Sequence, residues 1–193
     1  AIDSAALRDP DDSLLVSLGP TRATCDFGAL VHRRLVVTSL EVARPNVVVR
    51  QLPSGVWNWS RAIKPDTSPP QPSTGGPSPV AVVGPVRLSG GAVLLEVPWA
   101  PSDSLRGAAR DRAIDSALAA RVPIIRRSGN ALLRRREFSG ISIDAPLVRT
   151  AIGDTTVIAQ LNGLAVTSVD PDVTVRRIAG RVALIGSSVD LDL

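Results

Sequence analysis

The sequence is poor in the residues that most often build catalytic and metal centres. Among its 193 residues there is one histidine, His32, and one cysteine, Cys25, while tyrosine and methionine are absent. A lone histidine excludes a multi-histidine metal site, and a lone cysteine excludes an internal disulfide. We therefore interpret His32, which lies beside two arginines, as a surface turn residue, and Cys25 as a small apolar core residue.

Lysine is almost absent too. Lys64 is the only one, so the net charge of +4 is carried by arginine, with clusters at 126–127, 134–136 and 176–177. Nucleic-acid sites usually interleave such clusters with aromatic side chains that stack on bases. Aromatic residues are only 3% of the chain and Phe138 alone lies near a cluster, so we expect no nucleic-acid partner. Solvated surface is the simplest role for these arginines, and anionic lipid headgroups are the alternative partner.

What the chain has in quantity is aliphatic side chains. Hydrophobic residues are 44% of the chain, and with so few aromatics the core must come from Val, Ile, Leu and Ala. The 15 glycines and 16 prolines divide these residues into short apolar runs, which is typical of an all-β protein. No run approaches the roughly 18 apolar residues that span a membrane. We expect strands at 14–18, 22–27, 34–43, 46–52, 80–88, 92–97, 124–127, 131–135, 141–152, 156–169, 173–178 and 181–193.

Several expected strands are apolar in both alternating phases. This holds for residues 34–43, 46–52 and 92–97. A strand that is apolar on both sides needs two covers, a core on one side and something apolar on the other. We therefore predict a mostly β fold in which one continuous sheet carries apolar side chains on both surfaces, with one surface left for a guest.

Two segments interrupt the strand pattern. Residues 64–79 are rich in Pro, Ser, Thr and Gly, which predicts a flexible loop. Residues 104–121 are rich in alanine, with capping residues at 102–104 and a stop at Pro123, which predicts one inserted helix. Its apolar stripe is weak, so we expect an exposed or plug helix. The predicted organisation is one segment of a larger protein, 1–193, with a strand module at 1–63, the loop at 64–79, a hairpin at 80–101, the helical insertion at 102–122 and further strand modules at 123–193.

A more specific pattern lies between residues 34 and 97. RLVVTSLEVARPNVVVRQLPSGVWNW (34–59) is followed, after the polar loop, by VVGPVRLSGGAV (82–93). The order of a strand, a P-x-h-x-h strand, a G-x-W-N turn, a variable loop and an h-x-h-x-x-G-x-h-x-h segment, with h apolar, resembles the AsmA-like and TamB-like proteins of diderm bacteria. The match covers about a third of the chain, and Ser54 stands where the family usually has an acidic residue.

The residues of this pattern also have physical reasons to be there. Pro45 cannot donate to a ladder, so it begins a strand or lies at its edge. Gly55 supplies the backbone freedom of a tight turn, and Gly90-Gly91 is a second hairpin signal.

The turn carries the sequence Trp57-Asn58-Trp59. We expect Asn58 to hydrogen-bond the local backbone and the two tryptophans to cap an apolar sheet end rather than to stack on a ligand.

The resemblance implies an elongated, curved antiparallel sheet, the repeating β-groove, with an apolar concave face. Family members are anchored in the inner membrane, extend through the periplasm, and are associated with phospholipid movement to the outer membrane and with outer-membrane protein assembly. For this chain it implies a periplasmic segment near the N-terminal part of such a protein, with the anchor outside it. Its implied partners are phospholipid acyl chains and an outer-membrane β-barrel assembly protein. Whether the chain is nearer AsmA or TamB stays open.

Catalytic and metal motifs are weak. The acidic runs 9–12 and 170–172 lack the twelve-residue loop of a calcium site, and their prolines favour solvated turns. The glycine-rich pieces 73–76 and 89–91 lack the lysine and following helix of a phosphate loop. We expect no catalytic residue, no metal and no cofactor, and hence no enzyme.

Two functions are compatible with these observations. The first is an apolar groove that shelters lipid acyl chains, because each buried CH₂ contributes about 0.8 kcal/mol without specific polar contacts. The second is a scaffold whose sheet edges pair with strands of a partner. The apolar phases predicted to line the groove are Val47, Val49, Val86, Leu88, Val93, Leu95, Ile141, Ile143, Val157, Leu161, Val173, Val175, Val182 and Leu184.

Overall fold

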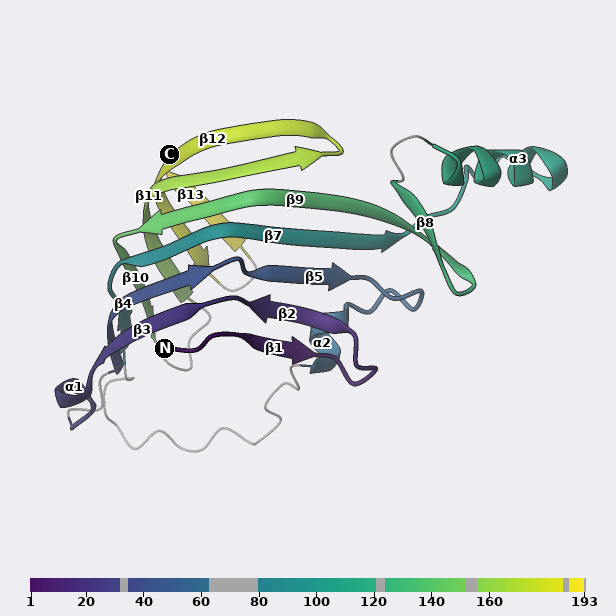
Figure 1. The fold of residues 1–193 in the computed structure, drawn as a ribbon. Helices are drawn as coiled ribbons and strands as arrows, with labels where there is room; N and C mark the ends of the chain where they lie inside the picture. Colours follow the sequence, from purple (N-terminus) through teal and green to yellow (C-terminus); the bar gives the residue numbers. More distant parts are fainter. Residues whose placement is uncertain (32–34, 63–79, 121–123, 152–155, 186–187, 193) are drawn as a thin grey trace.

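The computed structural model describes residues 1–31, 35–62, 80–120, 124–151, 156–185 and 188–192, and most of them lie in β-strands (Figure 1). The predicted mostly β fold is confirmed: the strands within these ranges form one curved 13-stranded sheet. The strands are β1 (Ala5–Arg8), β2 (Leu14–Leu18), β3 (Thr21–Asp26), β4 (Leu35–Ala43), β5 (Asn46–Arg50), β6 (Val80–Val83), β7 (Val86–Pro98), β8 (Ile125–Ser128), β9 (Ala131–Ala145), β10 (Leu147–Ala151), β11 (Thr156–Val169), β12 (Asp172–Ile185) and β13 (Ser188–Asp192). The helices are α1 (Phe27–Val31), α2 (Asn58–Ala62) and α3 (Gly107–Leu118).

The sheet is mixed, so the expectation of a purely antiparallel sheet is wrong. Strand β4 runs parallel to β6 and β7, and β5 runs parallel to β7. β6 begins beside the start of β4, with Ala81 opposite Leu35, so β6 and β7 repeat the direction of β4 and β5. All other pairs are antiparallel, with β9 between β7 and β11.

Bulges interrupt the long strands near their middles. In β7 the register to β9 shifts on both sides of Gly91, and Gly90 has a φ of 64°. The expected hairpin at Gly90-Gly91 is therefore wrong: both glycines lie inside one continuous strand, where a bulge needs the same backbone freedom as a turn. A Cβ on Gly91 would lie 2.9 Å from Leu88 Cδ2 and 3.2 Å from Ile141 Cβ, so a larger residue there would require these side chains to shift. Gly140 of β9, with a φ of 60°, marks the matching bulge on the neighbouring strand.

The bulges coincide with a bend of the whole sheet. In Figure 1 the long strands curve away from the viewer at one end, so that β10 and β13 lie behind the front strands. In β7 the Ala92 amide donates to the Pro45 carbonyl, and the Glu96 carbonyl accepts from the Gln51 amide. In a strand of L-residues, the direction of the strand and the side to which a residue's N–H and C=O point together fix the face on which its side chain lies. In the view of Figure 1, this rule places the side chains of Ala92 and Glu96 on the convex side, toward the viewer. The residues between them, such as Val93, therefore face the concave side.

The predicted helix is confirmed as an exposed element. α3 lies within the expected insertion, contains no buried residue, and stands away from the sheet (Figure 1). Its N-cap is Arg106 and makes no side-chain capping bond, so the expectation of a cap from residues 102–104 is wrong. The hydroxyls of Ser102 and Ser104 contact each other instead. The predicted loop at 64–79 and the predicted stop at Pro123 lie outside the described residues.

Candidate functional site

Cross-strand partners share a face of a sheet, so the ladder registers identify which side chains lie together on the concave side. Three rows cross the sheet, and the surface they form is called the concave face below. The first row is Val16, Val47, Val93, Phe138, Ser168 and Val173. The second is Val42, Leu88, Ile143, Leu164 and Ile178. The third is Val83, Val148, Ala159, Val182 and Leu191.

All fourteen residues predicted to line a groove lie on this face. The bulges make this possible, because they shift the phase of a strand by one residue without turning the apolar side chains to the other face. In β7, Leu88 before the bulge and Val93 after it both belong to the concave face, although one is even-numbered and the other odd. Whether lipid occupies this face remains a prediction.

The outer face is largely polar, so the prediction of two apolar surfaces is wrong. There Arg87 lies directly between Glu41 and Asp144 on the neighbouring strands. Arg50 and Glu96 form an ion pair on the same side, with Nη2 2.6 Å from Oε2. In β4 a register shift between Val37 and Ser39 brings apolar residues of both sequence phases to the concave face. In β5 and β7 no shift intervenes, and the paired Val48 and Leu94 are apolar residues of the outer face.

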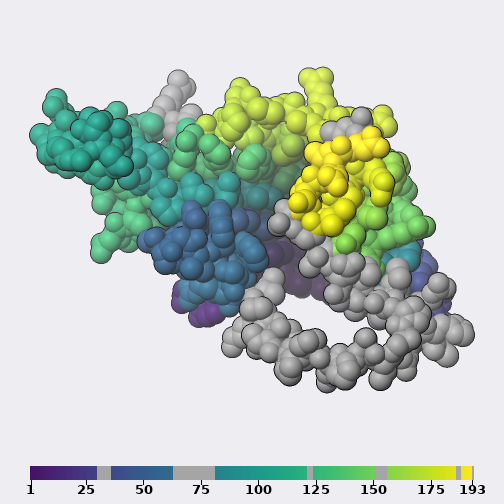
Figure 2. Space-filling model, turned by 180° about the vertical axis from the view of Figure 1, so that it is seen from behind, coloured from purple at the N-terminus to yellow at the C-terminus, as the bar shows by residue number. Residues whose placement is uncertain are grey.

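The concave face is not sealed by the described residues. Ala81 and Ala145 of this face are 6% and 2% exposed, but no large side chain in the described ranges is fully buried. Toward the β12–β13 edge the exposure of its apolar side chains rises to 39% at Leu184 and 60% at Leu191. Figure 2, seen from behind, shows a recess between the segment around α2 and β13. The arrangement offers an open apolar surface rather than an enclosed pocket.

Asn58 fixes the one turn of helix α2 to the sheet. It is 2% exposed, its Nδ2 donates to the Val48 carbonyl at 2.8 Å, and its Oδ1 accepts from the Arg50 amide at 2.9 Å. The side chain thereby replaces a strand beside β5, which confirms the predicted bond to local backbone. The turn before it uses Gly55 with a φ of 83°, as predicted.

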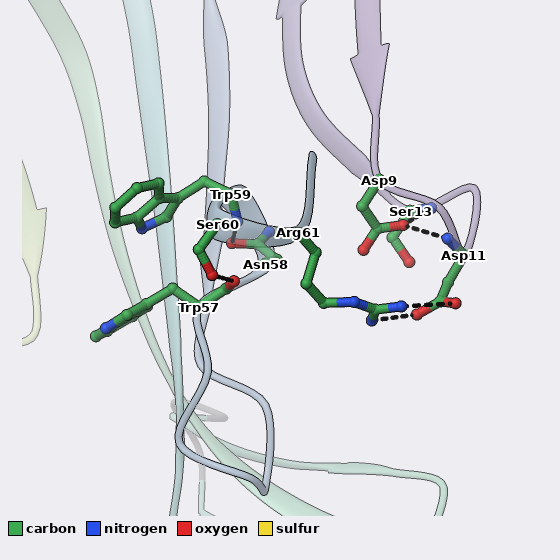
Figure 3. Close-up of polar contacts among 8 residues, drawn as sticks. All are labelled: Asp9, Asp11, Ser13, Trp57, Asn58, Trp59, Ser60 and Arg61. Atoms are coloured by element: carbon green, nitrogen blue, oxygen red, sulfur yellow. Dashed lines mark hydrogen bonds and ion pairs between the residues drawn. The ribbon is translucent and has the colours of Figure 1, made fainter. Parts of the chain in front are cut away.

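The two tryptophans differ in their surroundings. Both indoles project to the same side, away from Arg61 (Figure 3). Trp57 is half-buried, but Trp59 is 52% exposed, so the expectation that both cap a core is wrong for Trp59. An exposed indole is an amphipathic group that suits an apolar partner. Pro45 directly precedes β5, as predicted, and is buried.

The acidic turn between β1 and β2 has a structural role. The buried Asp9 carboxylate accepts from the amides of Asp11 and Ser13, both at 2.9 Å. Asp11 in turn pairs with Arg61 of α2, with Nη1 2.5 Å from Oδ2 (Figure 3). The hydrogen bond from Arg61, and then its charge, lower the pKa of Asp11, and the pKa of Arg61 is raised by the same bond. This pair ties α2 to the β1–β2 turn.

A basic cluster lies at one end of the concave face, where two arginines of the run 134–136 meet Asp170, a placement that the sequence analysis did not predict. Arg136 is the cross-strand partner of Leu95, and Arg134 that of Val97, so both guanidinium groups stand on the apolar side. Arg134 Nη2 donates to Asp170 Oδ2 at 2.9 Å. Their spacing of two residues along one strand was the signal that could have found them.

No catalytic or metal constellation is found within the described residues. No group of three His, Cys, Asp or Glu side chains there is placed to hold a metal ion. Cys25 is half-buried on β3, and His32 lies outside the described ranges. None of the helices in those ranges has the length and apolar content needed to cross a bilayer. Comparison of the chain with protein-family models, with curated proteins and with solved structures finds no match.

Proposed function

We propose that this chain is a non-catalytic segment that shelters phospholipid acyl chains on its concave face during transport between membranes. The observation that carries the proposal is the continuous apolar surface, built from valine, leucine and isoleucine of at least seven strands and left partly exposed. The longest row crosses six strands, and five spacings of about 4.8 Å make the surface about 24 Å wide along the sheet.

Energetics favour a lipid occupant over bare solvent. An acyl chain leaving a bilayer for water loses about 0.8 kcal/mol per CH₂, or on the order of ten kcal/mol for a whole chain. An apolar face removes most of this cost without specific contacts, so the same surface serves many lipids. Such a site needs no catalytic residue and no cofactor.

The likeness of residues 34–97 to AsmA-like and TamB-like proteins supports the same proposal. The same likeness leads us to propose a periplasmic location, an inner-membrane anchor outside this segment, and movement of phospholipid toward the outer membrane. These remain part of the proposal, supported by the sequence pattern and by the curved, one-sided apolar sheet.

Lipid transfer between vesicles tests the proposal with a matched pair of variants. Leu184 and Ile185 are adjacent and both exposed, but Leu184 pairs with Val189 on the concave side and Ile185 faces outward. We expect the protein to co-purify with phospholipid and to transfer it, and L184D to lower the transfer rate severalfold while I185D leaves it unchanged. Lipid-free protein without transfer activity would refute the proposal.

A scaffold role is the second candidate, and the free sheet edges favour it. In the part of the chain that the structure describes, β1 and β13 end the sheet, and every residue of both strands is exposed. Exposed edges can pair with a strand of an outer-membrane barrel precursor. A stable complex with such a precursor that is lost in V189P would support this role, and persistence of the complex would contradict it.

A further inference from the structure

The basic cluster is incompletely satisfied by its own neighbours. It comprises Arg134, Arg136, Ser168 and Asp170, so two guanidinium groups share one carboxylate and the cluster carries a net charge of 2 − 1 = +1. Arg136 Nε lies 4.0 Å from Asp170 Oδ2, too far for a hydrogen bond. The Nε atoms of both arginines and the Ser168 hydroxyl are buried and have no hydrogen-bond partner among the residues that the structure describes.

A structural role alone does not account for this arrangement. One arginine is enough to pair with Asp170, and the turn between β11 and β12 would be held equally well without Arg136. Buried donors without partners cost free energy, and Ser168 is only 4% exposed, so it gains little from bulk water. The two arginine Nε–H groups and the Ser168 hydroxyl are therefore hydrogen-bond donors that a bound acceptor would satisfy.

The position of the cluster defines the chemistry of that acceptor. On β7 its nearest concave-face neighbours are Leu95 and Val97, and Ser168 pairs with Val173, which is 45% exposed. A ligand must therefore present an anionic, oxygen-rich group to the arginines and an apolar body to the valines. Guanidinium groups match phosphate in shape and charge, and bind it through paired hydrogen bonds.

We propose that Arg134, Arg136 and Ser168 bind the phosphate group of an anionic phospholipid whose acyl chains lie on the concave face. This inference rests on the proposed function, because the apolar face must hold the chains. It also gives the bound lipid a direction. The headgroup lies near the start of β9 and the β11–β12 turn, and the acyl chains extend along the concave face toward the bend of the sheet. Asp170 acts as a positioning residue that orients Arg134 and competes with the phosphate.

The test compares two acyl-labelled lipids that share the same chains, phosphatidic acid and diacylglycerol, and inorganic phosphate alone. We expect the protein to bind phosphatidic acid at least about tenfold more tightly than diacylglycerol, which corresponds to about 1.4 kcal/mol. R134Q/R136Q should abolish this preference and retain diacylglycerol binding. If the double variant does not fold, R136Q alone replaces it, because Arg136 makes no hydrogen bond to Asp170.

Two further variants separate a bound phosphate from a general charge effect. R149Q/R176Q removes two exposed arginines whose positions lie away from the concave face, and it should keep the preference. D170N removes the competing carboxylate and should increase it, whereas a merely structural Asp170 would give the opposite result.

The outcomes distinguish failure of the site from failure of the proposed function. Equal affinity for the two lipids, or equal loss in R149Q/R176Q, overturns the headgroup site and leaves the acyl-chain function standing. Binding of inorganic phosphate that R134Q/R136Q abolishes, without binding of either lipid, overturns the lipid proposals and leaves a free-phosphate site. Binding of none of the three probes overturns both.

Discussion

Replacing Asn58 by alanine should destabilise the fold by about 3 kcal/mol. The side chain holds the Val48 carbonyl and the Arg50 amide, and it also accepts from the Trp59 amide at 3.0 Å. In N58A three backbone groups lose their partner at a position that is 2% exposed. An unsatisfied buried polar group costs about 1–3 kcal/mol, and partial entry of water places each at the low end of this range.

Urea unfolding followed by circular dichroism measures this loss as a lower midpoint with an unchanged slope. S60A is the matched control, since Ser60 lies on the same helix and its hydroxyl donates to the Trp57 carbonyl at 2.7 Å in an exposed position. Water replaces that bond, so S60A should change stability by less than about 1 kcal/mol. If N58A were as stable as the wild type, or S60A equally destabilised, Asn58 would not stand in for a strand beside β5.

Three other substitutions test separate parts of the fold. G84A should lower the free energy of unfolding in urea by about 1–3 kcal/mol, because the new Cβ would lie 2.6 Å from a carbonyl oxygen of β4. In the control G163A the new Cβ meets no atom within 4 Å, so its stability should be nearly unchanged. Similar losses in the two variants would contradict the close approach of β4 and β6. E96A should cost about 2 kcal/mol by the same measurement, because a nearly buried carboxylate leaves its arginine partner on the outer face, and an unchanged midpoint would show that the pair contributes nothing. D11N should destabilise the protein at neutral pH only. Because the folded-state pKa of Asp11 is lowered, the stabilisation that the Asp11 carboxylate contributes is complete above the ordinary pKa of 3.8 and is lost as the pH falls through the folded-state pKa. A loss of stability in D11N that does not depend on pH would exclude the ion pair as its cause.

Strand content and the identity of the apolar residues follow closely from the sequence. The strand predicted at 156–169 coincides with β11, and the apolar residues chosen for the groove share one face. Alternation within a short run is a local property, so it survives in the fold even where the run is only part of a longer strand.

The bulges and the parallel pairs could not be predicted in the same way. Gly90-Gly91 has the same composition in a hairpin turn and in a bulge, and only the partner strand β9 distinguishes them. A register shift within β4 likewise brings apolar residues of both sequence phases to one face. Parallel pairing of β4 with β7 depends on where a long connection returns, which no local pattern encodes.

The placement of the basic cluster on the concave face could not be predicted for a related reason. Arg134-Arg135-Arg136 looks in sequence like one charged surface run, but alternation along β9 sends Arg135 to the outer face and its two neighbours to the concave face. The partner Asp170 is 34 to 36 residues away and meets them only through the β9–β11 pairing.

The central claim is that lipid chains lie on one face of this sheet only. Photo-crosslinking from two neighbouring positions of β7 tests it directly, because Val93 belongs to the concave face and Leu94, the next residue, to the outer face. With a photoreactive residue at each position in turn, protein isolated from membranes should yield phospholipid adducts from position 93 and none from position 94. Equal labelling at both positions, or none at either, would contradict the account.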